Sequence, residues 1–406
     1  MVFLQKPQKM PPTVYIGIPA MDENQFLPHT LQCIKRQDYA GDIHTYVCVN
    51  QPDWWHNDPD HAELCRRNAE TLKFLEGEQS VTAIDRSTPG NGWQSKKKSG
   101  VGIARQTILD QILHNAQDND IFVSMDADCH FSEHYISAIV EKLESAPKLS
   151  AINPPYYHCL TGNARTDRNI LRYEIYMRTF MLNMLRIKSP FAFTAFGSAI
   201  ACRTSTCRTL GNFGAQQAGE DFYFLQKIAK HGNILLYNEE TVYPSARISH
   251  RVPFGTGQTV GETASCHPIF HPSFFDKVSD TYKIIDDIYQ HDIHNELLDF
   301  IQADANENVW GQSRQNAATA EQFRKMFHQK CDGLRIFQFL RHLAQSTHYT
   351  DEKSLKDFFT ASYPEFPFTD NFSFEHSPIE TLTAIRDFLS ETERKARFTH
   401  DSERKF

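Results

Sequence analysis

The sequence predicts an α/β protein: a mostly parallel, doubly wound sheet followed by a helical C-terminal region. Two observations support this prediction. Up to residue 145, short β-branched runs alternate with segments whose apolar residues recur at helical spacing. After residue 262 the helical spacing continues, while strand patterns become scarce. We therefore expect a sheet domain over 13–261 and a helical region over 262–406.

Strands and helices are predicted in strict alternation. The first run, TVYIGIPA, is continuously apolar, as in a strand buried on both faces. The predicted strands are 13–20, 43–50, 81–85 and 121–125. The predicted helices are 25–37, 62–77 and 101–116. Because short crossover connections of this kind join parallel strands, ligands are expected at the carboxyl ends of the strands.

A long helix is predicted from Asn163 to Lys188, with apolar residues three or four positions apart. We interpret this stripe as facing a core, and a face that binds an acceptor or touches a membrane is the alternative. The role of the helical region after residue 262 stays open between dimerisation, acceptor binding and membrane docking.

Composition argues against several classes of protein. With 406 residues and a net charge of -8, the chain lacks the basic character of a nucleic-acid binder. Its nine cysteines are scattered, with no pair at the two-residue spacing of zinc or redox sites. The N-terminal residues lack the apolar core of a signal peptide, and the apolar stretch Ser189–Cys202 is too short to cross a bilayer. We expect a cytoplasmic protein, with peripheral contact at the inner face of the membrane left open.

Two aspartates follow the fourth predicted strand. In an extended chain Asp126 and Asp128 point the same way, so their charges repel unless a cation or a proton neutralises them. Mg²⁺ and Mn²⁺ bind one or two carboxylates and complete their coordination with water and phosphate oxygens. The pair therefore predicts a metal and diphosphate site, and a turn in which an aspartate caps the next segment is the alternative.

Other polar residues are expected at the same edge of the sheet. Glu23 follows the first strand, and Asn50 and Asp53 end the second. Glu220 and Asp221 open a predicted helix, either as ordinary helix capping or with Asp221 as a general base.

Two basic segments add candidate anion sites. In PSARISHRVPFGTGQTVG, the cationic residues Arg247, His250 and Arg251 accompany glycines. This segment is predicted to close over a diphosphate, with His250 completing the metal site, unless it is only a basic surface loop. In GNGWQSKKKSGVG, lysines and glycines precede a helix, which indicates an anion site or a solvated face.

Taken together, these motifs resemble a family-2 glycosyltransferase of the GT-A fold, over roughly Thr13 to Gly261. The resemblance rests on IGIPAMDE, GVGIARQ, SMDADC, AGEDFYFLQKIAKHG and RISHRVPFGTG, in that order. It implies a Rossmann-like sheet domain and a set of site residues. The implied nucleotide-sugar contacts are Pro19, Ala20, Glu23, Asn50, Asp53, Arg105, Asp126 and Arg251. The implied metal ligands are Asp126, Asp128 and His250, and the implied catalytic residues are Asp221, as base, and Glu220.

The same resemblance implies an inverting transferase that uses Mn²⁺ or Mg²⁺. Its donor would be a nucleotide-diphosphate sugar, with a UDP-sugar favoured, and its acceptor a glycan, a lipid-linked or a small-molecule hydroxyl. Asn50 and Asp53 depart from the aspartates that many relatives carry, and Trp54 or Trp55 is an alternative partner for the base. Whether the chain forms a homo-oligomer is left open by these motifs.

The motifs of two other classes fit this sequence less well. A haloacid dehalogenase-like phosphatase carries its aspartate pair on the first strand, and His130 stands where such enzymes have Thr or Val. A nucleotidyltransferase requires a glycine-rich arginine motif that does not follow the first strand here. The remaining alternative is an inactive GT-A-like domain whose helical region serves as an interaction module.

Overall fold

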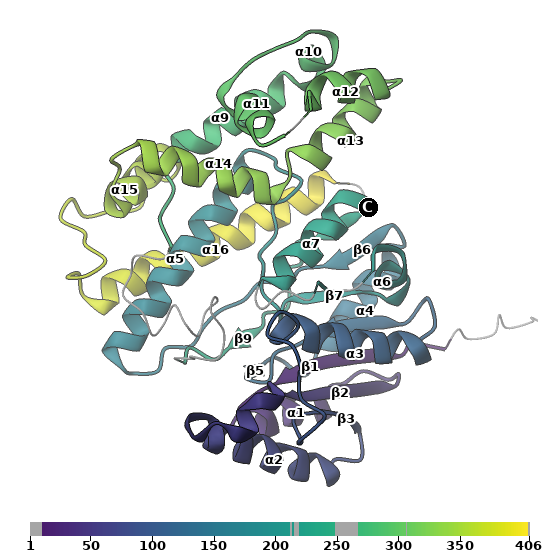
Figure 1. The fold of residues 1–406 in the computed structure, drawn as a ribbon. Helices are drawn as coiled ribbons and strands as arrows, with labels where there is room; N and C mark the ends of the chain where they lie inside the picture. Colours follow the sequence, from purple (N-terminus) through teal and green to yellow (C-terminus); the bar gives the residue numbers. More distant parts are fainter. Residues whose placement is uncertain (1–9, 212, 215–218, 248–266, 306, 405–406) are drawn as a thin grey trace, which may run out of the picture. The chain divides into compact units, whose positions relative to one another are not determined.

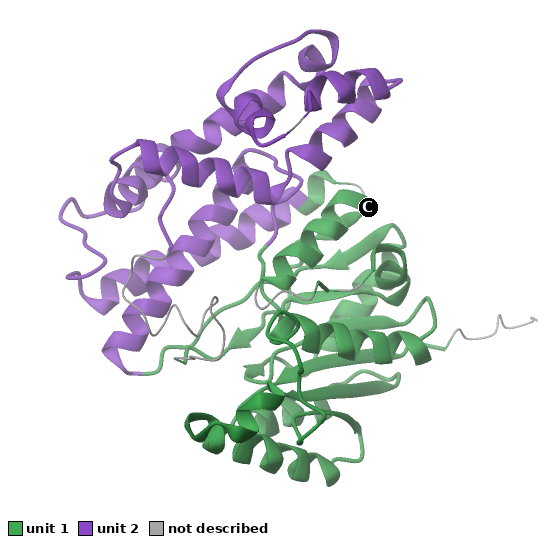
Figure 2. Ribbon diagram, in the orientation of Figure 1, with its two compact units in different colours: residues 1–161, 194–261, 401–406 green, residues 162–193, 262–400 purple. Residues whose placement is uncertain are grey.

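The structure is a computed structural model that describes residues 10–211, 213–214, 219–247, 267–305 and 307–404 (Figure 1). The chain forms two compact units, one of residues 1–161, 194–261 and 401–406, and one of residues 162–193 and 262–400 (Figure 2). All strands among the described residues belong to the first unit. The long helix expected from Asn163 is found at Ala164–Arg186, and it belongs to the second unit, although it interrupts the first along the chain.

The first unit is built on a seven-stranded sheet in the order β3-β2-β1-β4-β7-β6-β8. All neighbouring strands pair parallel except β7, which is antiparallel to β4 and β6. The strands of the sheet are β1 (Val14–Ala20), β2 (Ile43–Asn50), β3 (Val81–Arg86), β4 (Ile121–Ser124), β6 (Leu149–Ile152), β7 (Ile200–Arg203) and β8 (Asn233–Leu235). This mostly parallel sheet confirms the predicted α/β fold class.

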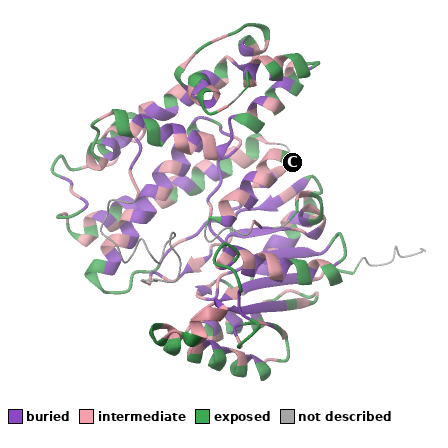
Figure 3. Ribbon diagram, viewed as in Figure 1, coloured by how far each residue is buried: buried purple, intermediate pink, exposed green. Residues whose placement is uncertain are grey.

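Helices cover both faces of the sheet. On one face Ile16 and Ile18 of β1 share a core with Leu31 and Ile139. On the other face Gly17 lies against α3, where a Cβ atom at residue 17 would be 2.7 Å from the Ile108 side chain. Figure 3 shows the strands as largely buried, as expected between two helical layers. The helices of this unit are α1 (Leu27–Lys35), α2 (Ala62–Glu76), α3 (Val101–Asn115), α4 (Tyr135–Ser145), α6 (Thr204–Leu210) and α7 (Glu220–His231), with short 3-10 helices η1 (Asp53–Asn57) and η2 (Pro59–His61).

The second unit contains only helices among its described elements. Its helices are α5 (Ala164–Arg186), α9 (Pro272–Lys283), α10 (Ile285–Gln290), α11 (Glu296–Ala303), α12 (Val309–Asn316), α13 (Ala320–Lys330), α14 (Gly333–Ser346), α15 (Asp351–Ser362) and α16 (Ile379–Glu403). The apolar stripe of α5 faces a core, since Phe180 packs edge to face against Phe275 and Phe337. Among the residues that the structure describes, no helix has both the length and the apolar composition that crossing a bilayer requires.

A small second sheet follows β4. The strand ends at Ser124, one residue earlier than predicted, so Asp126 and Asp128 lie on a turn instead of a strand. After this turn, β5 (Cys129–His130) pairs antiparallel with β9 (Tyr243–Pro244). This pairing brings residues more than 100 positions apart to the carboxyl end of β4.

Candidate functional site

A cluster of charged side chains lies at the carboxyl ends of β1 and β4. Its first centre is Arg105 on α3, of which only 4% is exposed. The guanidinium donates from Nε to Glu220 Oε1 at 2.9 Å and from Nη1 to Ser124 Oγ at 2.6 Å, and Nη2 contacts Asp126 Oδ1. Arg105 therefore joins the aspartate turn after β4 to the start of α7.

The backbone makes room for this guanidinium at Gly197. A Cβ atom there would lie 2.0 Å from Arg105 Nη2, far inside any allowed contact. Burial opposes the charge on Arg105, but the neighbouring Asp126 and Glu220 carboxylates raise its pKa above the ordinary value. The arginine is thus held in one position and stays charged.

The two acidic residues that open α7 share a crowded environment. Burial, reinforced by the charge of Asp221, raises the pKa of Glu220 to about 7, although Arg105 opposes the shift. Burial also raises the pKa of Asp221, to which the nearby Asp126 contributes. A carboxyl group whose proton affinity is raised in this way is suited to accept a proton near neutral pH.

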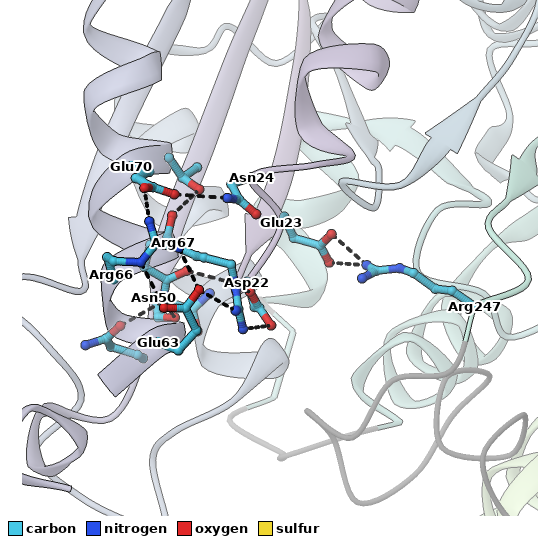
Figure 4. Close-up of polar contacts among 12 residues, drawn as sticks. Asp22, Glu23, Asn24, Asn50, Glu63, Arg66, Arg67, Glu70 and Arg247 are labelled. Carbon is cyan, nitrogen blue, oxygen red and sulfur yellow. Dashed lines mark hydrogen bonds and ion pairs between the residues drawn. The ribbon is translucent and has the colours of Figure 1, made fainter. Parts of the chain in front are cut away.

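The second centre of the cluster is Arg247, shortly after β9. Its Nε donates to Asp128 Oδ2 at 2.8 Å. Its Nη2 lies 2.6 Å from both carboxylate oxygens of Glu23 (Figure 4). The guanidinium also stacks over the Phe26 ring, 4.1 Å from its centre. Burial opposes the charge, but Asp128 and Glu23 raise the pKa of Arg247. The pairing of β5 with β9 explains why Arg247 meets Asp128. Next to this pair, Ser245 N donates to Asp128 O at 3.1 Å.

Glu23 is presented by a strained turn after β1. The preceding Asp22 has φ of 62°, a left-handed conformation that costs a non-glycine residue about 1–2 kcal/mol. Side chains of α2 hold it there: Asn68 Oδ1 accepts from Asp22 N at 2.8 Å, and the Arg67 guanidinium binds the Asp22 carboxylate (Figure 4). The turn directs the buried Glu23 side chain toward Arg247.

The residues expected at the ends of the first two strands lie together. Pro19 and Ala20 end β1, and Asn50 donates from Nδ2 to Ala20 O at 3.1 Å while its Oδ1 accepts from Trp93 Nε1 at 3.2 Å. Asn50 is buried and joins two backbone segments. Asp53 accepts from Gly90 N at 2.7 Å, and its hydrogen bonds, first to Gln94 and then to Gly90, lower its pKa.

The two tryptophans after β2 differ in their surroundings. Trp55 stacks on His61, with ring centres 4.2 Å apart. Trp54 has the Lys96 ammonium over its ring at 6.0 Å. Both rings are partly exposed at the edge of the sheet.

The aspartate turn offers a limited donor set for a metal ion. Among the described residues, no group of three or more His, Cys, Asp or Glu side chains is arranged to hold one. Within this part of the chain, Asp126 Oδ2 and Asp128 Oδ1 accept no hydrogen bond, because the arginines bind the other oxygens. Two carboxylates with one such oxygen each fit Mg²⁺ or Mn²⁺ when phosphate and water supply the remaining ligands. His250 and Arg251, predicted for metal and donor binding, lie outside the described residues.

Of the predicted residues, Glu23, Arg105, Asp126, Asp128, Glu220 and Asp221 lie in this charged cluster. Ala20 and Asn50 contact each other at the ends of β1 and β2, and Asp53 contacts Gly90. Ser124 and Gly197, which fix Arg105, were not assigned from the sequence, and Arg247 was expected in the basic segment without its carboxylate partners. A serine inside a buried strand carries a detectable signal, because Ser124 is the one polar residue of IFVS. Neither the role of Gly197 nor the pairing of Arg247 has such a signal in the sequence, since both depend on contacts between distant segments.

Comparison with solved structures finds, among others, two that contain a nucleotide sugar. Staphylococcus aureus TarS 1-349, in complex with UDP-GlcNAc, is 12% identical with a TM-score of 0.39, over 96% of this chain and 90% of that one. The mannosyltransferase PcManGT of Pyrobaculum calidifontis, in complex with GDP-Man and Mn²⁺, is 15% identical with a TM-score of 0.36, over 98% of this chain and 91% of that one. No protein-family model and no curated protein sequence matches the chain. Any activity of this chain has to be argued from its own side chains.

Proposed function

We propose that the chain is a glycosyltransferase that uses a nucleotide-diphosphate sugar. One observation carries the proposal: among the described residues of the cluster at the ends of β1 and β4, carboxyl groups outnumber guanidinium groups. The five carboxyl side chains are Glu23, Asp126, Asp128, Glu220 and Asp221, and the two guanidinium groups are Arg105 and Arg247. Buried negative charge of this kind requires a cation or a proton. The excess matches the needs of a site that binds a metal ion together with a diphosphate.

Asp126 and Asp128 are the residues that would hold Mn²⁺ or Mg²⁺, through the oxygens that the arginines leave available. When bound, such an ion neutralises the negative charge that develops on the departing diphosphate. Donor recognition is assigned to Glu23, Asn50 and Asp53 at the ends of β1 and β2, with Pro19 and Ala20 forming the backbone wall.

Asp221 is proposed as the general base. It stands in the first turn of a rigid helix, and burial has raised its pKa toward the range in which a base works. The acceptor oxygen attacks the anomeric carbon, the bond from that carbon to the diphosphate oxygen breaks, and Asp221 takes the hydroxyl proton. Because attack is opposite to the leaving group, the anomeric configuration inverts. Glu220 acts as a positioning residue through its hydrogen bond with Arg105.

The donor is expected to carry UDP or GDP, with UDP favoured, and the acceptor to be a glycan, a lipid-linked or a small-molecule hydroxyl. Cytoplasmic location and contact with a membrane surface remain part of the proposal. An inactive sheet domain that only supports a helical interaction module is the competing hypothesis.

Calorimetric titration tests the proposal. UDP and GDP are titrated into the full chain with Mn²⁺ or with EDTA, and then into Asp128→Ala. The matched control is Asp118→Ala, an exposed carboxylate of the same unit that pairs with Arg208. We expect binding of one nucleotide that requires Mn²⁺, is lost in Asp128→Ala and is kept in the control. Absence of binding for both nucleotides, with and without metal, would overturn the proposal.

A further inference from the structure

The two arginines of the cluster are held differently. Arg105 is almost fully buried, fixed by Ser124, Asp126 and Glu220, and Gly197 lies directly against it. Arg247 keeps 19% of its side chain exposed and has an aromatic ring on one face. The first arginine is therefore enclosed by the fold, whereas the second is accessible to a ligand.

Arg247 also binds a carboxylate that the proposed metal ion needs. It bridges Glu23, through both carboxylate oxygens, and Asp128, through Nε. The guanidinium and a divalent cation compete for the same charge on Asp128, because each is stabilised by that carboxylate. Glu23 has no such conflict, since it lies on the turn that Arg67 and Asn68 fix from α2.

We propose that Arg247 is an exchangeable counter-ion of the donor site. In the free protein its guanidinium neutralises Glu23 and Asp128 together. When a divalent cation binds Asp128, the guanidinium stays bound to Glu23. Its Nε–H group, which no longer donates to Asp128, then donates to the diphosphate of the donor. This inference rests on the proposed function and adds to it a residue for diphosphate recognition. A planar guanidinium is suited to the task, because its donors match pairs of phosphate oxygens.

The first arm of the test measures Mn²⁺ alone, without nucleotide. We expect Arg247→Gln to bind Mn²⁺ about tenfold more tightly than the wild type, because a charge-assisted hydrogen bond no longer competes for Asp128. Arg247→Lys keeps the charge but cannot bridge two carboxylates in the same way, so a smaller gain is expected. The matched control is Arg172→Gln in the helical unit, since Arg172 also stacks over a phenylalanine, 4.4 Å from the ring centre of Phe374, and pairs with Asp351.

The second arm measures UDP and GDP at saturating Mn²⁺. Here Arg247→Gln is expected to weaken nucleotide binding about tenfold, the opposite sign from the first arm, because the diphosphate loses a cationic partner. A residue with a merely structural role would weaken both ligands. Tighter Mn²⁺ binding combined with weaker nucleotide binding supports the exchange, and an unchanged or weaker Mn²⁺ affinity overturns it.

The two proposals fail separately. If the wild type binds neither nucleotide with Mn²⁺, the proposed function fails. If it binds one and Arg247→Gln leaves Mn²⁺ affinity equal to the wild type and the Arg172→Gln control, only the exchange fails. Circular dichroism and thermal unfolding verify that each variant folds. If Arg247→Gln does not fold, the directions in which Arg247→Lys changes Mn²⁺ affinity and nucleotide affinity decide whether the exchange holds.

Discussion

Two clusters of arginine and carboxylate side chains, one in each unit, differ in charge balance among the described residues. In the helical unit the cluster joins α5 to α16. Its buried members are Arg178, Arg386, Arg397, Glu174 and Glu393, and the half-exposed Asp387 also pairs with Arg386. In the sheet unit five carboxyl groups share the guanidinium groups of Arg105 and Arg247.

We interpret the difference as one between a structural cluster and the proposed functional one. A buried ion network tolerates little imbalance, because every unpaired charge costs several kcal/mol. Among the described residues of the helical cluster, three guanidinium groups face three carboxylates, of which Asp387 is half exposed. Among those of the cluster at the sheet edge, carboxyl groups are in excess, and burial, reinforced by the charge of Asp221, raises the pKa of Glu220 to about 7. Sites that bind cations or move protons are expected to keep such an imbalance.

The largest expected effect concerns Asp221 and catalysis. Asp221→Asn removes the proposed base while keeping shape, so sugar transfer should fall by about 10²–10⁴-fold. Nucleotide release from UDP- and GDP-sugars measures the rate, and calorimetry should show nucleotide affinity within about threefold of the wild type. Asp118→Asn is the control, as an exposed carboxylate of the same unit. Unchanged transfer in Asp221→Asn would remove the sheet-edge cluster from the chemistry.

The next effect concerns stability and the helical cluster. Arg178→Ala removes the buried guanidinium that binds one carboxylate oxygen of Glu174 and one of Glu393, and the free energy of unfolding should fall by about 3–5 kcal/mol in urea titration. Arg186→Ala, at the end of the same helix, breaks a half-exposed pair with Asp276 and should cost about 0–1 kcal/mol. Equal losses in the two variants would show that burial does not set the cost.

Asp128→Asn, in contrast to Arg178→Ala, should have little effect on stability and a large effect on Mn²⁺ binding. It removes one carboxylate from a cluster that has too many, and Arg247 retains Glu23, so unfolding should change by only about 1 kcal/mol or less. Mn²⁺ binding should weaken at least about tenfold, because a charged ligand is lost. A large loss of stability with unchanged Mn²⁺ affinity would assign this cluster a structural role and abolish the contrast with α5 and α16.

The smallest expected effect is a change in how the stability of the folded chain depends on pH. The pKa of Glu220 is about 7 in the folded chain, against 4.5 ordinarily, so the folded state binds the proton more tightly than the unfolded state. Stability from this group is present at low pH and is lost as pH rises from about 4.5 to about 7. Glu220→Gln cannot titrate, so its thermal stability should decline less over this interval than that of the wild type. Parallel profiles would mean that the pKa of Glu220 is not raised in the folded chain; the exposed Glu133→Gln serves as the control.

Much of this arrangement could be predicted from local sequence. The alternation of apolar runs predicts the parallel sheet, and β1 and β2 begin and end within a residue of their predicted positions. The acidic start of α7 was also expected at Glu220. One local detail was wrong: β4 ends before Met125, because the chain turns there to let Asp126 and Asp128 meet different arginines. Roles for His250 and Arg251, outside the described residues, stay predictions.

The sequence by itself therefore determined the order of strands and helices and the acidic residues at the strand ends, because periodicity and strand termination are local properties. Only the tertiary structure decided which cation meets which carboxylate. Arg105 reaches Glu220 across 115 positions, and Arg247 reaches Glu23 across 224, through the β5–β9 register and the turn at Asp22. Such pairings follow from how distant segments pack, so no short stretch of sequence contains them.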